Sequence, residues 1–432
     1  MKTIATHTLG CKVNQYDTEA MLEAFERAGY APVDFEEAAD VYLINTCTVT
    51  GTGDKKAMQA IRRVKRLHPD AAVVVAGCLA QRDAERVLRE GVDLVIGVQR
   101  RGEVVTLLER ALAEGKPLSA VGPLKGASFE SLFVSRHEGK TRAAMKIQEG
   151  CDRYCAYCVI PSVRGPVRSM PLSDVRAEAA RLAGAGYREI VVTGIHLASY
   201  GRERGESLLD AVRAVHDAPG VSRVRLGSLE PVVVTEEFAR TLSQLPGLMR
   251  QFHLSLQSGS AGVLRRMRRR YTPEEYLAAL ERLRKHMPDA AMTTDVLTGF
   301  PGETEAEAAE TLAFVEKCAF ARIHVFPYSR RAGTVADRMP DQVPEGVKKA
   351  RTAELIRLGN QLERRFVKNM VGTVQEVLFE QEVTAPEGVL SEGYTSQYVR
   401  VRAAARPGAL CRVRIRKVEG TLAFGEVLEE AT

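Results

Sequence analysis

Short apolar runs that alternate with longer amphipathic stretches are the feature that most limits how this sequence can fold. Between residues 1 and 133, runs long enough for buried strands occupy 2–10, 40–46, 71–77 and 92–98. The stretches between them, such as 18–29 and 55–68, carry apolar residues at helical spacing. Strands that alternate with helices predict a parallel sheet with helices on both faces.

A second series of the same kind follows a linker-like segment at 123–132. Its helical patterns include 172–186 and 272–286. Six strand-helix units favour a partial (β/α)6 barrel with active groups at the carboxyl ends of its strands. The predicted strands lie at 143–148, 189–194, 223–228, 252–258, 292–299 and 322–329.

The last segment has short alternating runs rich in Gly and Pro and no helical period. These runs lie at 372–380, 398–403, 411–420 and 422–428. They predict a small all-β barrel of a kind that often binds nucleic acid. We therefore expect an α/β multidomain protein with domains at 1–133, 134–368 and 369–432.

Composition narrows the class of protein. A length of 432 residues predicts two or three domains, and a net charge of +6 favours an anionic partner such as nucleic acid. The sequence shows no signal peptide and no apolar run near the ~18 residues of a membrane helix, so we expect a cytoplasmic protein without membrane contact. In a reducing compartment, eight cysteines indicate metal binding or catalysis rather than disulfides.

Three of these cysteines crowd one loop after the first strand of the second series: Cys151, Cys155 and Cys158. Closely spaced thiolates can hold several corners of an iron–sulfur cluster. A zinc site would need four ligands, or three and a water, but only His137 precedes the strand and no His or Cys soon follows Cys158. Three unrelated buried thiols are the remaining alternative, which such crowding disfavours.

A second cysteine set is dispersed in the first series. Cys11, Cys47 and Cys78 each come at the end of a different predicted strand. Adjacent parallel strands bring their carboxyl ends to one edge, where ligands bind, so these thiols are predicted to form a second site. Unrelated small residues at strand ends are the alternative. Cys318 and Cys411 are interpreted as core residues.

The spacing of Cys151, Cys155 and Cys158 after a strand resembles that of the radical S-adenosylmethionine (SAM) enzymes. The resemblance implies that the thiolates bind a [4Fe-4S] cluster with one open iron. SAM would chelate that iron and be cleaved to a 5′-deoxyadenosyl radical.

Other strand ends support a cofactor pocket. Alternation in 252–258 places His253, Ser255 and Gln257 on one face, and a polar face on a barrel strand usually marks a site. The segments around Gly299 and Phe326 resemble the family's adenine-contacting segments. The predicted SAM-binding residues are Thr193, Gly194, Ser228, Glu230, Ser255, Gln257, Gly299 and Phe326.

Motifs over the whole chain resemble the methylthiotransferases within this superfamily. They include TLGCKVNQYDTEAM, NTCTVT, GCLAQ, KIQEGCDRYCAYCVIPSVRGPVRS, QSGS, GFPGET and FPYSRRAGT, and the end of the chain resembles a TRAM domain. The resemblance implies a second [4Fe-4S] cluster on Cys11, Cys47 and Cys78 that carries the sulfur to be inserted. One SAM would methylate that sulfur, and a second would supply the radical that removes hydrogen from adenosine C2.

The motifs GCKVNQYDTE and NTCTVT are most similar to the branch that acts on N6-threonylcarbamoyladenosine at position 37 of tRNA. The implied partners are the anticodon stem-loop and an electron donor such as a flavodoxin or ferredoxin. Two alternatives within the family are isopentenyladenosine in tRNA and a ribosomal-protein aspartate. A non-enzymatic RNA-binding module would leave both cysteine sets unexplained.

Basic and aromatic residues are the candidates for RNA contact. An arginine run follows the fourth predicted barrel strand, with a solvated helix face as the alternative reading. The segment 411–420 alternates arginines on one strand face that suit a phosphate backbone. Two tyrosines nearby are predicted to stack on a base, with core packing as the alternative. The set is Arg265, Arg266, Arg268, Arg269, Arg270, Tyr394, Tyr398, Arg412 and Arg414.

Overall fold

The computed structural model describes residues 1–134, 141–385 and 388–430. Its first part is a six-stranded parallel sheet in the order β2-β1-β3-β4-β5-β6. Its elements are β1 (Thr3–Thr8), α1 (Lys12–Arg27), β2 (Ala31–Val33), β3 (Val41–Thr46), α2 (Gly51–Leu67), β4 (Ala72–Gly77), α3 (Cys78–Arg82), α4 (Ala84–Leu88), β5 (Leu94–Val95), α5 (Val104–Glu114) and β6 (Leu118–Ser119).

Side-chain alternation along these strands produces two separate cores. Leu43 and Val74 pack with α1 and α5, whereas Tyr42, Ile44 and Val73 pack with α2 on the opposite face. The sheet is therefore buried on both sides, and the carboxyl ends of β1, β3 and β4 lie next to one another at one edge.

The central part is an open barrel of six parallel strands, as the sequence predicts. Two sheets, β10-β9-β7-β8 and β11-β12-β13, are joined by bridges from Val224 to Leu248 and from Leu229 to Leu254. The strands are β7 (Arg142–Glu149), the antiparallel β8 (Arg168–Ser169), β9 (Glu189–Gly194), β10 (Arg223–Leu226), β11 (Gln251–His253), β12 (Ala291–Thr298) and β13 (Arg322–Pro327).

Helices cover the outside of this barrel and share one large core with its strands. They are α7 (Leu172–Gly184), α8 (Leu208–His216), α9 (Glu236–Ser243), α11 (Pro273–His286), α12 (Glu305–Cys318) and α13 (Glu345–Lys368), with the short α6 (Ile160–Arg164) and α10 (Ala261–Arg266) at the carboxyl ends of strands. On β7, Ala143, Met145 and Ile147 belong to this outer core. The alternate residue Lys146 therefore faces the other way, toward α1, where it forms an ion pair with Asp17.

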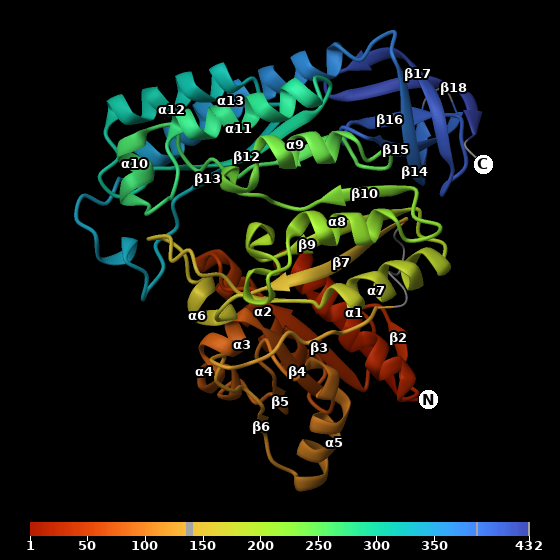
Figure 1. Ribbon diagram of the computed structural model, residues 1–432. Coiled ribbons are helices and arrows are strands. Elements are labelled where there is room, and N and C mark those ends of the chain that lie inside the picture. Colours follow the sequence, from red (N-terminus) through yellow and green to blue (C-terminus); the bar gives the residue numbers. More distant parts are fainter. Residues whose placement is uncertain (135–140, 386–387, 431–432) are drawn as a thin grey trace.

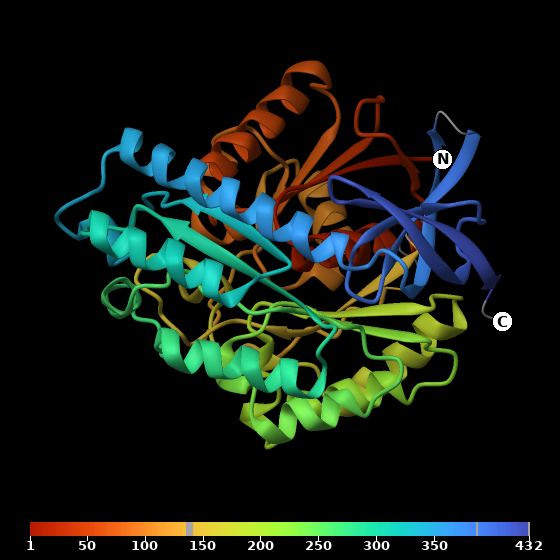
Figure 2. The ribbon, with the colours of Figure 1, turned by 90° about the horizontal axis from the view of Figure 1, so that it is seen from above.

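The last part is a closed five-stranded barrel in the order β14-β15-β16-β18-β17, which confirms the predicted small β-barrel. Its strands are β14 (Val374–Ala385), β15 (Gly388–Thr395), β16 (Arg400–Ala403), β17 (Leu410–Glu419) and β18 (Leu422–Glu430). Figure 1 shows this barrel at one side of the central part, opposite the loops that carry the site. Figure 2 shows α13 running from the central part toward it.

Cys318 and Cys411 are buried in the cores of the central part and of the C-terminal barrel, as predicted. Among the described residues, no helix is long and apolar enough to cross a membrane.

Candidate functional site

Cys11, Cys47 and Cys78 lie at the carboxyl ends of the neighbouring strands β1, β3 and β4. The glycine before Cys11 permits a close approach, because a Cβ on Gly10 would lie 2.8 Å from Cys47 Cβ and its φ is +111°. Burial raises the pKa of the Cys78 thiol to about 11, and the charges of Cys47 and Cys11 add to the shift. The structure thus brings the three dispersed cysteines together.

Cys151, Cys155 and Cys158 lie in the loop that follows β7. The N–H of Cys158 donates to the carbonyl of Cys155 at 3.0 Å, and the N–H of Cys151 donates to the carbonyl of Gly165 at 3.0 Å. Burial raises the pKa of Cys151 to about 11 and that of Cys158 to about 12, with a further contribution from neighbouring thiols. The six thiols therefore form two triads, in which Cys78 is buried, Cys11 is exposed and the other four are partly buried.

The chemistry of these thiols fits iron–sulfur clusters. Thiols with raised pKa values are protonated at neutral pH, and a bound metal would convert them to thiolates. Within residues 1–134, 141–385 and 388–430, no three His, Cys, Asp or Glu side chains converge on one metal ion. A cubane cluster does not require such convergence, because each thiolate binds a different iron. His137 lies outside the described residues.

A buried carboxylate, Glu230, organises the second triad. It contacts Arg153 at 2.9 Å, His196 at 3.0 Å and Arg269 at 3.0 Å. Burial opposes its ionisation, but the hydrogen bond from His196 and the nearby positive charges lower the pKa of Glu230 to about 2. Arg269 also donates to Cys155 Sγ at 3.3 Å, so a fixed cation lies beside one of the thiols.

The predicted SAM-binding residues follow the carboxyl ends of the barrel strands, on the same side as this triad. Thr193 and Gly194 end β9, Ser228 and Glu230 follow β10, and Ser255 and Gln257 follow β11. The Phe326 side chain on β13 is 51% exposed. Gly299 lies against α13, because a Cβ there would be 2.3 Å from Lys348 Cγ. Its missing side chain leaves room for Lys348, and its contact with SAM stays a prediction.

The arginine run divides into inward and outward residues. Arg265, Arg268 and Arg270 are exposed. Arg266 forms an ion pair with Glu307 at 2.7 Å. Arg269 is predicted to contact RNA, but its side chain is only 7% exposed and lies in the cysteine site, where it contacts Glu230 and Cys155.

Three of the four residues predicted for RNA contact in the C-terminal barrel, namely Arg412, Tyr394 and Tyr398, already have side-chain partners. Arg412 pairs with Glu429 at 2.6 Å, and Arg414, also exposed, is opposite Glu426 on β18. Tyr394 and Tyr398 stack on each other with ring centres 4.5 Å apart. The guanidinium groups of Arg142 and Arg225 also contact these rings, so part of their surface is already covered.

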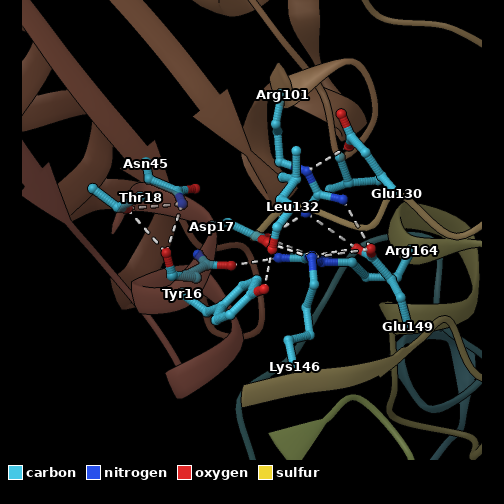
Figure 3. Close-up of polar contacts among 12 residues, drawn as sticks. Tyr16, Asp17, Thr18, Asn45, Arg101, Glu130, Leu132, Lys146, Glu149 and Arg164 are labelled. Carbon is cyan, nitrogen blue, oxygen red and sulfur yellow. Dashed lines mark hydrogen bonds and ion pairs between the residues drawn. The ribbon is translucent and has the colours of Figure 1, made fainter. Parts of the chain in front are cut away.

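Sequence reasoning missed a buried ionic network between the N-terminal sheet and the central barrel (Figure 3). Its members come from α1, α6, β7 and the segment before α5, and they show no short-range motif that marks them as partners. They are Asp17, Arg101, Lys146, Glu149 and Arg164, with Glu130 at the margin.

Known families match both halves of the site. The profile of "Uncharacterized protein family UPF0004" matches residues 3–97, and that of the "Radical SAM superfamily" matches residues 145–315. The threonylcarbamoyladenosine tRNA methylthiotransferase MtaB of Bacillus subtilis is 43% identical over 93% of this chain and 90% of its own length. The tRNA-2-methylthio-N(6)-dimethylallyladenosine synthase of Acidothermus cellulolyticus is 38% identical over 87% of this chain and 77% of its own length.

Among solved structures, the radical S-adenosylmethionine methyltransferase TsrM of Kitasatospora setae is similar in fold. It was solved with cobalamin and a [4Fe-4S] cluster bound, and it matches with a TM-score of 0.58 at 16% identity, over 87% of this chain and 77% of its own.

Proposed function

The chain belongs to the methylthiotransferase family of radical SAM enzymes, and on this premise we propose that it methylthiolates tRNA. The substrate is N6-threonylcarbamoyladenosine at position 37, next to the anticodon, and the product is its 2-methylthio derivative. The observation that carries this proposal is the pair of thiol triads in a chain that matches threonylcarbamoyladenosine enzymes over nearly its whole length.

Membership in the radical SAM superfamily implies a [4Fe-4S] cluster and SAM. The residues proposed to hold this cluster are Cys151, Cys155 and Cys158. When bound, the cluster and SAM supply the radical chemistry that removes hydrogen from adenosine C2. The protein holds Arg269 against Cys155 through Glu230, which keeps a positive charge at the thiol and limits the movement of the loop.

The strand ends are proposed to bind and orient the cofactor. Thr193, Ser255 and Gln257 offer polar groups on the side of the barrel that carries the triad, and the exposed ring of Phe326 offers an apolar face to a base. Gly194 supports the arrangement indirectly, because a Cβ there would lie 2.8 Å from Gln148 Cβ on β7.

The second [4Fe-4S] cluster, on Cys11, Cys47 and Cys78, is also a proposal, supported by the approach of the three thiols to one another. It would carry the sulfur for transfer. The N-terminal sheet is tied to the β13 side of the barrel by the ion pair of Arg331 with Asp54 at 2.8 Å. This contact and the buried network keep the two triads in a fixed relation.

RNA and redox partners complete the proposal. The exposed residues Arg265, Arg268 and Arg270 flank the second triad, where they suit phosphates of an anticodon stem-loop. Arg270 also donates to the carbonyl of Asp152 at 3.3 Å, which holds it against the cysteine loop. A flavodoxin or ferredoxin is the proposed electron donor.

The decisive experiment is mass spectrometry of tRNA nucleosides from a host that lacks this gene, with and without the gene restored. Appearance of 2-methylthio-N6-threonylcarbamoyladenosine only on restoration supports the proposed substrate. Appearance of the dimethylallyladenosine product instead would show that isopentenyladenosine is the substrate. An unchanged tRNA with a modified ribosomal aspartate would show that the substrate is the ribosomal protein.

Cysteine variants test the assignment of the two triads. Cys155→Ala should abolish 5′-deoxyadenosine formation, and Cys47→Ala should abolish methylthio product while cofactor cleavage persists. Wild-type protein reconstituted without oxygen should hold about eight irons per chain. A Cys47→Ala variant that still forms product would refute the role of the N-terminal triad.

A further inference from the structure

Arg164, the last residue of α6, reaches from the loop of one cysteine triad to the other. Its Nε donates to Cys78 Sγ at 3.2 Å. The next residue, Gly165, accepts the N–H of Cys151 through its carbonyl at 3.0 Å. Two consecutive residues therefore touch both triads, one through a side chain and the other through the backbone.

The guanidinium of Arg164 has a fixed orientation. Nη1 donates to Asp17 Oδ2 at 3.1 Å and to Glu149 Oε1 at 2.6 Å, and Nη2 donates to Asn14 Oδ1. The residue is fully buried. Because the two terminal nitrogens are engaged by side chains of α1 and β7, the remaining Nε–H points at the sulfur of Cys78.

The backbone on the other side of Arg164 is equally constrained. Gly165 and Gly150 both have positive φ, of 69° and 76°. A Cβ on Gly150 would lie 1.8 Å from the carbonyl oxygen of Pro166. The chain after α6 is thus packed directly against the residue that precedes Cys151, and it leaves no room for Arg164 to shift without moving that loop.

The charges around Arg164 suit a negatively charged neighbour. Within the network of Figure 3, the buried cations are Arg101, Lys146 and Arg164, whereas the fully buried carboxylates are Asp17 and Glu149. Glu130, which contacts Arg101, is 20% exposed. With Glu130 counted, three cations face three carboxylates, and Arg164 is the one of these cations that donates to a thiol, so its positive charge lies at Cys78.

We propose that Arg164 is a positioning residue that binds the Cys78 ligand of the N-terminal cluster and raises the reduction potential of that cluster. The inference rests on the proposed function, since it assumes a cluster on Cys11, Cys47 and Cys78. A charged hydrogen bond to a ligand sulfur stabilises the more negative, reduced form of a cluster. The same contact fixes the N-terminal triad relative to the loop of Cys151.

The test uses the full chain with Cys151, Cys155 and Cys158 replaced by Ala, so that only the N-terminal triad can bind a cluster. This background is compared with Arg164→Gln, Arg164→Lys and Arg101→Gln introduced into it. Arg101→Gln is the matched control, because Arg101 contacts Asp17 at 2.5 Å and Glu149 at 2.9 Å in the same network but bonds to no thiol of the described residues. After anaerobic reconstitution, iron content and the midpoint potential are measured, the latter by redox titration followed by electron paramagnetic resonance.

We expect about four irons per chain in the background and a more negative midpoint potential in Arg164→Gln. Arg164→Lys should show a smaller shift, because lysine keeps the positive charge but lacks the several fixed N–H donors of a guanidinium. Arg101→Gln should show no shift. An unchanged potential in Arg164→Gln, or an equal shift in Arg101→Gln, would overturn the inference.

Failure of a variant to bind iron would also decide between the proposals. If the background binds no iron, the second cluster of the proposed function is itself refuted, and the inference falls with it. If Arg164→Gln alone fails to load iron or to fold, the potential of Arg164→Lys decides, and a value equal to that of the background would contradict the role of Arg164.

Discussion

The guanidinium of Arg142 on β7 lies 5.0 Å from the ring centre of Tyr394 and 4.9 Å from that of Tyr398. Arg225 on β10 lies 4.8 Å from the Tyr398 ring and donates to the carbonyls of Thr395 and Ser396. The turn between β15 and β16 is therefore held at the amino ends of the barrel strands. These tyrosines join the C-terminal barrel to the central barrel.

Replacing Tyr398 with Ala should lower the free energy of unfolding by about 2–3 kcal/mol, because it removes one ring stack and two cation–π contacts. Chemical denaturation measures this change. Val389→Ala is a control on β15, the strand that leads into this turn, since Val389 is 67% exposed, and it should change the free energy by less than about 0.5 kcal/mol. An unchanged stability together with a loss of RNA affinity would instead support the predicted base stacking by Tyr398.

The close approach of Cys11 to Cys47 depends on the absence of a side chain at Gly10. Gly10→Ala would place a Cβ 2.8 Å from Cys47 Cβ at a φ of +111°, so the thiols must move apart. We expect the variant to lose most of the iron of the N-terminal triad, measured per chain after reconstitution. Gly29→Ala is the control: its φ of +86° carries similar strain, but nothing lies within 4 Å of the added Cβ. Equal iron loss in both would attribute the effect to backbone strain alone.

Most of the fold follows from patterns that a single sequence displays. Strands such as β3 and β4 are buried at every position and mostly apolar, since helices cover both faces of the sheet. The unpredicted strands β2, β6 and β8 have three residues or fewer, too short to show any period. In β15, Gly, Ser and Glu occupy buried positions, so its sequence lacks the alternation of a half-buried strand.

In the candidate site, too, some residues can be predicted from local sequence and others cannot. The cysteines are recognisable because their spacing and their places after strands are local. Arg164 and Asp17 are 147 residues apart, and their contact depends on how the N-terminal sheet packs against β7. In the sequence, Arg269 cannot be told apart from the arginines on either side of it. In the structure, the positive φ of Arg268 turns the chain and directs Arg269 inward.

Glu230 should give stability that depends on pH. Its pKa falls from 4.5 to about 2 on folding, so its stabilising effect is complete above about pH 5 and is lost as the pH falls from 4.5 toward 2. Glu230→Gln should therefore cost roughly 3 kcal/mol at pH 7 and much less near pH 3. Urea denaturation at both pH values measures the difference.

Glu236→Gln is the control for this prediction. The pKa of Glu236 is also lowered to about 2, through hydrogen bonds from Lys285 and His286, but the group is fully exposed. Solvent screens such a pair, so its loss should change stability far less at either pH. A pH-independent cost of Glu230→Gln would show that packing, rather than charge, accounts for the effect.

Phosphate contact by the exposed arginines should be visible in the salt dependence of RNA binding. If Arg268 and Arg270 each neutralise one phosphate, each Ala variant should weaken binding of an anticodon stem-loop and reduce the slope of log K against log salt by about 0.7–0.9. Arg412→Ala should change the slope little, because Glu429 already pairs with Arg412 at 2.6 Å. The opposite pattern, with Arg412 affecting the slope and Arg268 and Arg270 not, would move the RNA interface from the mouth of the central barrel to the C-terminal barrel.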